Sequence, residues 1–197
     1  REMRRARAIR RVWSAEEDNV KNTVTVSLKK ERLASVCIRD ILLSGSCRAV
    51  LPMDLYRGRK YCFGVYHTAG LQCLRQCKHL TADQALRAAG ALLRMQDICR
   101  DHLIFPADYV LSMDTLYAKR DYTEMQLLFI PTDNDRIENP HKRLLTLLQS
   151  MKRLTSPCGA DYLAALQELL QMRSCGNEQV LGSLQQWREE IAVSGLC

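Results

Sequence analysis

The segment that follows Thr81 constrains the fold most, because it combines a helix start signal with a long apolar face. Thr81 and Gln84 have the spacing of a capping box, in which each side chain satisfies a backbone N–H of the first helical turn. From Ala85 to Cys99, apolar residues recur every three or four positions and so share one side of a helix. The pattern predicts a helix that runs to about Asp101 and buries that side.

Shorter periodic segments precede this helix. Residues 23–28 alternate between apolar and hydroxyl-bearing side chains, which is typical of a half-buried strand. Residues 33–41 carry apolar side chains at helical spacing, and the breaker cluster Ser44-Gly45-Ser46 ends that pattern. We therefore expect a strand followed by a helix.

A β-hairpin is predicted next, because residues 51–55 and 61–65 each alternate in polarity. Between them stands Arg57-Gly58, which predicts a short turn in which Gly58 is able to adopt a positive φ. Pro52 cannot donate to a ladder of hydrogen bonds, so the first arm is expected at a sheet edge or as a strand that begins late.

The remaining segments shift from strand-like to helical along the chain. After a short predicted helix over 71–77 and the long one from Thr81, strand-like residues recur at 109–111, 115–118 and 124–130. Helices are predicted over 141–154, 160–173 and 177–193, with Cys175-Gly-Asn177 supplying a Gly stop and an Asn N-cap. This order predicts an α+β domain with a strand-rich N-terminal part and a helical C-terminal part.

The positive charge is concentrated at the N-terminus. The net charge is +7, of which residues 1–11 contribute +5. We expect residues 1–19 to form a basic arm and residues 20–197 a single domain, divided into a small part over 20–80 and a helical part over 81–197. The candidate contact residues are the arginines of this arm, Arg1, Arg4, Arg5, Arg7, Arg10 and Arg11.

Three roles remain open for the arm. It is solvated, or it contacts an anionic membrane surface or an acidic partner, or it binds nucleic acid. The nearly neutral body disfavours nucleic acid, because proteins that bind it with a folded surface carry their charge there. Binding that weakens steeply with salt and disappears when residues 1–11 are deleted would favour it.

The cysteines predict a reducing, cytoplasmic setting. Their number is nine, which is odd, and several stand among apolar residues as small hydrophobic side chains do. One group, Cys73, Cys77 and His79 with Cys99 and His102, has ligand types that zinc accepts. Its irregular spacing favours ordinary thiols over a metal site, so no metal is predicted.

Other sequence signals define what the chain lacks. It contains neither a P-loop nor a G-x-G-x-x-G sequence, so no phosphate-binding cofactor is predicted. No apolar run approaches the roughly 20 residues of a membrane-spanning helix. The first residue is Arg rather than Met, and we expect the chain to be part of a longer protein.

The segment from His102 to Pro131 resembles a stretch of the protein kinases. There a long helix is followed by H-R-D-x-K-P-x-N-I-L and a pair of strands, and here a helix is followed by His102-Leu-Ile-Phe-Pro106-Ala-Asp-Tyr-Val-Leu111 and two strand-like segments. Residues 20–193 are more specifically similar to an uncharacterised bacterial domain often found before a forkhead-associated (FHA) domain. That domain is similar to the kinase-like cytosolic module of the type VII secretion protein EssB/YukC.

The resemblance implies a reduced, kinase-like fold, and the departures from the kinase pattern imply a pseudokinase. Leu103 and Ile104 stand where the catalytic Arg and Asp of a kinase would stand, and residues 127–130 contain no acid to bind magnesium. We therefore expect no enzyme activity and no catalytic residue. The expected role is a scaffold in a signalling or secretion-associated protein, which binds another protein or another domain of its own chain through the arm or the groove between its two parts. A divergent kinase with displaced groups is the alternative.

Overall fold

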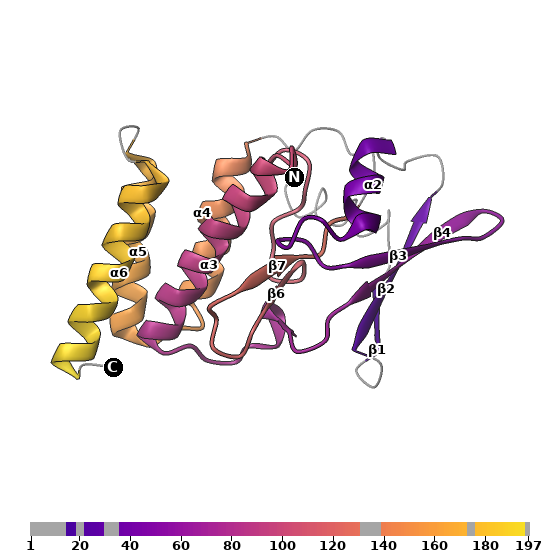
Figure 1. The fold of residues 1–197 in the computed structure, drawn as a ribbon. Helices are drawn as coiled ribbons and strands as arrows, with labels where there is room; N and C mark the ends of the chain where they lie inside the picture. The colour runs from indigo at the N-terminus through magenta and orange to yellow at the C-terminus, as the bar shows by residue number, and fades with distance from the viewer. Residues whose placement is uncertain (1–14, 19–21, 30–35, 131–138, 173–175, 196–197) are drawn as a thin grey trace, which may run out of the picture.

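The computed structural model describes residues 15–18, 22–29, 36–130, 139–172 and 176–195. Figure 1 shows strands at one end of the molecule and helices at the other, joined by a small central sheet. In chain order the elements are β1 (Ala15–Asp18), β2 (Thr23–Lys29), α2 (Val36–Ser44), β3 (Met53–Arg57), β4 (Tyr61–His67), β5 (Gln72–Cys73), the 3-10 helix η2 (Leu74–Gln76), α3 (Ala82–Asp101), β6 (Leu116–Ala118), β7 (Met125–Leu127), α4 (Pro140–Lys152), α5 (Pro157–Gln171) and α6 (Asn177–Ser194).

The N-terminal sheet has four antiparallel strands in the order β1-β2-β4-β3. Alternating residues bury one face, including Val24 and Val26 of β2 and Cys62 and Tyr66 of β4. The alternation that predicts β2 and the hairpin thus reflects a sheet with one face against the core. β1 pairs with β2, so the sheet begins at Ala15, inside the range 1–19 predicted as an arm.

The hairpin turn differs from the prediction. Gly58 donates its N–H to the Tyr61 carbonyl at 2.8 Å, so the loop consists of Arg59 and Lys60. The φ of Gly58 is not positive. A Cβ at this position would lie 2.9 Å from the Tyr61 carbonyl oxygen and 3.2 Å from the Phe63 ring, so Gly58 is needed for close packing rather than for its backbone freedom. Pro52 precedes β3, an edge strand, as expected.

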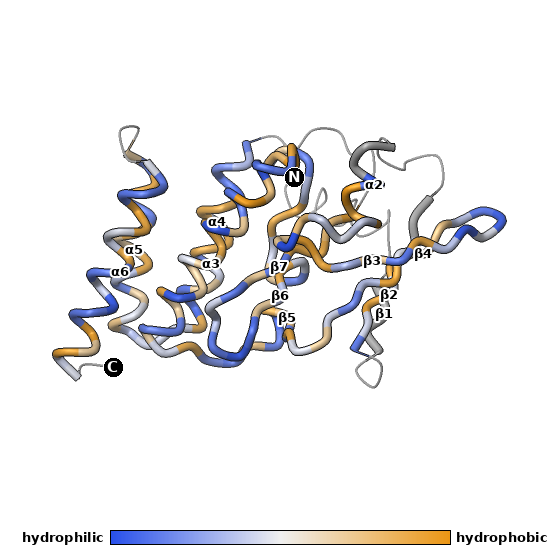
Figure 2. The backbone as a smooth tube through the Cα atoms, viewed as in Figure 1, coloured by the Kyte–Doolittle hydropathy of each residue, from blue (hydrophilic) through white to orange (hydrophobic). Residues whose placement is uncertain are grey.

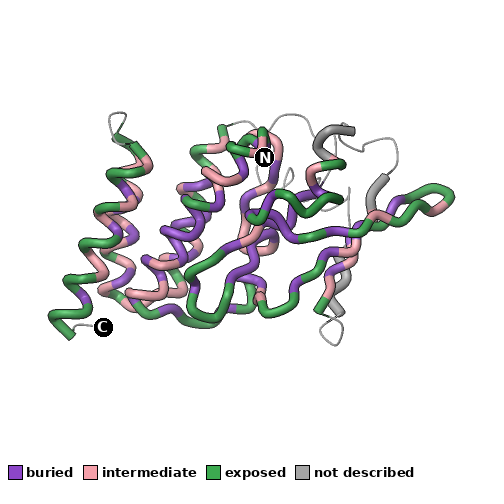
Figure 3. Tube along the Cα trace, viewed as in Figure 1, coloured by how far each residue is buried: buried purple, intermediate pink, exposed green. Residues whose placement is uncertain are grey.

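α3 is the central helix of the second half, and its predicted start is confirmed. The Gln84 N–H donates to the Thr81 hydroxyl at 3.2 Å, and the Thr81 N–H donates to the Gln84 side-chain oxygen at 3.0 Å. α3 packs against α4, α5, α6 and β7. Figure 3 shows the buried stretch of α3 that results, and Figure 2 shows apolar residues along the same helix.

Three local predictions were wrong. Residues 71–77 form β5 and η2 instead of a helix, because β5 pairs with β6 to complete a three-stranded sheet. Residues 109–111 form no strand. The N-cap of α6 is Gly176 rather than Asn177, whose side chain instead donates to Asp97 at 2.8 Å.

Five of the described cysteines, Cys47, Cys62, Cys73, Cys77 and Cys99, are buried free thiols, as predicted. Cys158 departs from that prediction, because it is disulfide-bonded. Among the residues that the structure describes, no helix has both the length and the apolar character needed to span a membrane.

Candidate functional site

The two halves of the molecule meet at the loop between α2 and β3. The Leu127 N–H donates to the Ala49 carbonyl at 2.8 Å, and the Leu51 N–H donates to the Leu127 carbonyl at 2.9 Å. The side chain of Gln126 adds a bond to the Arg48 carbonyl at 3.1 Å. Backbone pairing therefore joins the first half of the chain directly to β7.

A buried tyrosine strengthens this junction. Tyr66 of β4 donates its hydroxyl to the Phe129 carbonyl at 2.6 Å, across 63 residues of sequence. Burial raises the pKa of Tyr66 far above its ordinary value, so the phenol stays protonated and remains a donor. Sequence reasoning missed this contact, because nothing local to either residue indicates its partner.

We expect Tyr66→Phe to lower the free energy of unfolding by about 1–3 kcal/mol, since it leaves the buried Phe129 carbonyl without its donor. Urea denaturation of the two proteins would measure the difference. Tyr56→Phe is the matched control, because the Tyr56 side chain is exposed, and it should leave stability almost unchanged. Equal stability of Tyr66→Phe and the parent protein would contradict the role given to this bond.

The loop after α3 contains Ile104, which the sequence resemblance to the kinases places at the catalytic Asp. Ile104 is fully buried, and its N–H donates to the Cys99 carbonyl at 2.9 Å. Leu103 adopts a φ of 60°, which turns the chain so that its own side chain is 70% exposed while Ile104 points inward. Asp108 accepts the Phe105 N–H at 2.9 Å, so it is a turn residue.

Residues 127–130, which the same resemblance places at the magnesium-binding motif of a kinase, are equally apolar. Leu127, Leu128, Phe129 and Ile130 are all buried. The four acids between residues 102 and 130 each have a structural partner: Asp108 binds the Phe105 N–H, Asp114 pairs with Arg75, Asp121 binds Thr123, and Glu124 pairs with Lys119. Among the described residues of this segment, each acid is therefore engaged in a turn or an ion pair.

The cysteines proposed as one group occupy two different places. The thiol of Cys73 donates to the Met113 carbonyl at 3.3 Å, and that of Cys77 lies 3.2 Å from the Tyr122 hydroxyl. Cys99 instead faces Cys47. In the described part of the chain, no three or more His, Cys, Asp or Glu side chains are arranged to hold a metal ion.

Cys47 of the α2–β3 loop and Cys99 of α3 form a thiol pair. A hydrogen bond from Cys99 lowers the pKa of Cys47 to about 6, with a smaller contribution from His102, although burial opposes the shift. The same pairing and burial raise the pKa of Cys99. The His102 ring bonds the Ile98 carbonyl at 2.9 Å, which raises the pKa of this imidazole. Both thiols are buried. Because Cys99 belongs to α3 and Cys47 to the loop before β3, their contact joins α3 to the first half of the molecule.

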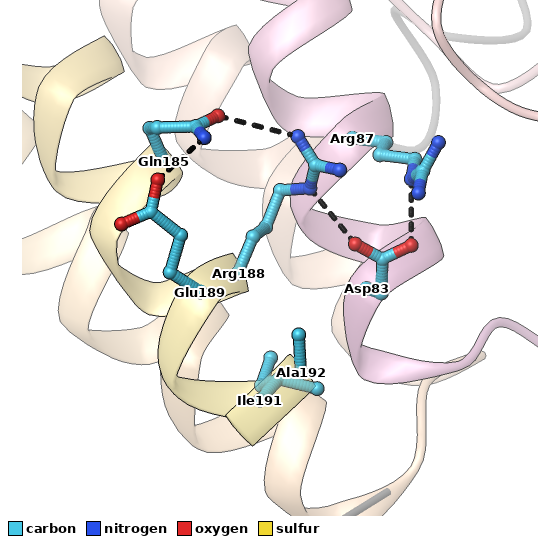
Figure 4. A pocket seen from close by; sticks show the side chains of 7 residues that line it. All are labelled: Asp83, Arg87, Gln185, Arg188, Glu189, Ile191 and Ala192. Carbon is cyan, nitrogen blue, oxygen red and sulfur yellow. Dashed lines mark hydrogen bonds and ion pairs between the residues drawn. The ribbon is translucent and has the colours of Figure 1, made fainter. Parts of the chain in front are cut away.

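A hollow of about 310 Å³ lies between α3 and α6 (Figure 4). Asp83 accepts hydrogen bonds from Arg87 at 2.6 Å and from Arg188 at 2.8 Å. Burial alone would raise the pKa of Asp83, but the bonds from Arg188 and Arg87 hold it below its usual value. Glu189 also lines the hollow, so the charges there cancel. We interpret this cluster as a set of ion pairs that holds α6 against α3 rather than as a ligand site.

The predicted arm lies mostly outside the described residues. This applies to all its arginines, Arg1, Arg4, Arg5, Arg7, Arg10 and Arg11, so their role stays a prediction.

Comparisons with known proteins identify the fold. No family model and no curated protein matches the sequence. Among solved structures, the chain is similar to the EssB cytoplasmic fragment of Geobacillus thermodenitrificans, with 13% identity and a TM-score of 0.60 over 95% of this chain and 93% of that one. It is also similar to an apo pseudokinase, with 10% identity and a TM-score of 0.57 over 90% and 87% of the two chains.

A further similar structure is a divergent kinase that lacks the glycine-rich loop and regulates membrane ultrastructure of the Toxoplasma parasitophorous vacuole. The identity is 11% and the TM-score 0.51, over 84% of this chain and 66% of that one. These likenesses show a kinase-like fold of the kind found in pseudokinases, with strands first and helices later. The predicted fold class is confirmed.

Proposed function

We propose that this chain is a non-catalytic, kinase-like interaction domain that binds another protein or another domain of its own chain. The observation that carries the proposal is the burial of Ile104 and of residues 127–130, which the sequence resemblance to the kinases places at the catalytic Asp and the magnesium ligand. Phosphoryl transfer relies on positioned charges, above all magnesium and the groups that hold it. Buried apolar side chains supply none of these.

The kind of larger protein to which this domain belongs is proposed from its resemblance to other proteins. The similarity to the EssB cytoplasmic fragment supports a cytoplasmic domain of a larger secretion-associated protein. The resemblance to domains found before an FHA module supports a signalling protein instead. Both settings use the domain as a scaffold, and neither requires a bound cofactor.

Nucleotide binding is the direct test. We expect ATP with magnesium chloride to leave the melting temperature unchanged. A ligand bound only by the native state at about 100 times its Kd would add about 2.7 kcal/mol of stability. An active protein kinase serves as the positive control. A magnesium-dependent rise in melting temperature, accompanied by transfer of labelled phosphate to any protein, would replace this proposal with the divergent-kinase alternative.

A further inference from the structure

The β3–β4 hairpin carries three aromatic side chains that the fold leaves exposed. Tyr56, Tyr61 and Phe63 are 58%, 44% and 39% exposed. Tyr56 lies directly opposite Phe63, and Tyr61 is two residues before Phe63 on the same strand, so all three lie on one face of the hairpin. Figure 1 shows the hairpin projecting beyond the rest of the molecule.

The domain does not need these aromatic rings for its own core. The buried residues of β4 are Cys62, Gly64 and Tyr66, which alternate with the exposed ones and lie on the opposite face. A cluster of large exposed aromatic side chains is characteristic of surfaces that bind a partner.

The tip of the hairpin is basic. Arg57, Arg59 and Lys60 are exposed, and none forms an ion pair with any described residue. No Asp or Glu occurs from Leu55 to Ala82. Figure 2 shows this polar tip continuing into the more apolar part of the hairpin. The tip therefore favours an acidic partner.

The same hairpin presents an open strand edge. The Pro52 carbonyl accepts the His67 N–H at 2.9 Å, and the Gly58 N–H donates to the Tyr61 carbonyl at 2.8 Å. Since hydrogen-bonding groups alternate along an antiparallel strand, the backbone groups of Met53, Leu55 and Arg57 point away from β4. Met53 is buried, so the open part of this edge is the end of β3 that carries the partly buried Leu55 and the exposed Arg57. β3 is the last strand of its sheet, and the described residues place no further strand beside it.

We propose that this hairpin surface, defined by Tyr56, Tyr61, Phe63, Arg57, Arg59 and Lys60, docks an extended acidic segment of a partner protein. The segment pairs with the free edge of β3, its acidic side chains meet the basic tip, and its apolar side chains contact the aromatic rings. The open edge favours a peptide over a nucleic acid, because only a peptide backbone can continue the ladder of hydrogen bonds. This inference rests on the interaction function proposed above and names its surface and the chemistry of its partner.

Selection from a library of random twelve-residue peptides displayed on phage tests the proposal. We expect the selected peptides to be acidic, and we expect their Kd to rise at least tenfold for two variants of the protein. One is Tyr56→Thr/Tyr61→Thr/Phe63→Thr, and the other is Arg57→Glu/Arg59→Glu/Lys60→Glu. N-methylation of alternate peptide nitrogens should weaken binding to the parent protein similarly, since it removes donors to the β3 edge.

Leu103→Ser and Val193→Ser are the matched controls, because they remove exposed apolar side chains elsewhere on the surface. Both should bind the selected peptides as the parent protein does. Melting temperatures of all variants would show that they fold. Three results would overturn the proposal: no peptide is enriched, the enriched peptides are not acidic, or they bind both hairpin variants as tightly as the parent.

Binding of a labelled oligo(dT) of twenty nucleotides tests the competing possibility that the hairpin binds nucleic acid. Tight binding of this DNA that is lost in the two hairpin variants would also overturn the proposal, in favour of nucleic acid. Peptides that bind at another surface would refute the hairpin assignment while leaving the interaction function in place. Nucleotide binding and phosphate transfer, measured separately, would refute that function itself.

Discussion

Replacement of Ile104 with Asp is expected to lower the free energy of unfolding by about 3–5 kcal/mol at pH 7, the usual cost of an unpaired buried charge. This substitution restores the acid of the kinase catalytic loop in sequence terms. Ile104 is fully buried, however, and its surroundings in the loop after α3 are packed against the core. We therefore expect a destabilised protein rather than a gain of phosphoryl transfer.

The loss of stability in the Ile104→Asp variant should increase as the pH rises. Burial raises the pKa of the introduced carboxyl in the folded state above its value of about 3.9 in the unfolded state. The charge penalty is absent below that unfolded pKa, grows as the pH rises through the interval between the two pKa values, and is constant above the folded one. The variant should therefore be closest to the parent protein below about pH 4.

Ile104→Val is the control for this experiment, because it removes one methylene without adding charge and should cost about 0.5–1.5 kcal/mol. Urea denaturation across the pH range would measure all three proteins. An Ile104→Asp protein that is as stable as Ile104→Val at pH 7, or that transfers phosphate from ATP, would contradict the apolar junction on which the proposed function depends.

Gly159→Ala is expected to lower the free energy of unfolding by about 2 kcal/mol, within the usual range for overpacking a core. Gly159 is buried near the start of α5, where that helix meets the start of α3. A Cβ there would lie 2.3 Å from the Thr155 side chain and 2.8 Å from the Ala82 Cα. Since one of these atoms belongs to the backbone, α5 itself must move.

The loss of stability would also involve the contact between the segment before α3 and the segment before α5. The Leu80 N–H donates to the Leu154 carbonyl at 2.8 Å, and the Ser156 N–H donates to the Leu80 carbonyl at 3.2 Å. These bonds hold the segment before α3 against the segment before α5, so displacement of α5 strains them as well. Thermal and urea denaturation would show the loss.

Gly182→Ala provides a matched control in α6. A Cβ at Gly182 meets no atom within 4 Å, and Ala is favoured over Gly inside a helix by up to about 1 kcal/mol. This variant should be slightly more stable than the parent protein. If Gly159→Ala were stabilising to the same extent, the close packing of α5 against α3 would be refuted.

Sequence patterns predict the elements whose signals are local. The capping box at Thr81 locates the start of α3, alternation identifies β2 and both arms of the hairpin, and breaker residues separate α4, α5 and α6. The apolar character of Ile104 and of residues 127–130 is also evident in the sequence, and with the resemblance to the kinases it leads to the prediction of a pseudokinase without any coordinates.

Other features depend on partners that are distant in the chain. Residues 72–73 became a strand because β6 pairs with them, although their local pattern favours a helix. Gly58 has an ordinary φ and is instead required by the approach of the Phe63 ring. The bond from Tyr66 to Phe129 joins residues 63 positions apart, and neither has a local signal for it.

The amino-acid sequence by itself therefore determined the start of α3, the strands β2, β3 and β4 and the apolar character of residues 104 and 127–130, because helical and strand periodicity act over a few residues. Only the tertiary structure decided which cysteine faces Cys99, which glycine tolerates no side chain, and which aromatic residues remain exposed on the hairpin. Those outcomes depend on contacts between distant segments, and such contacts form only when the whole chain packs.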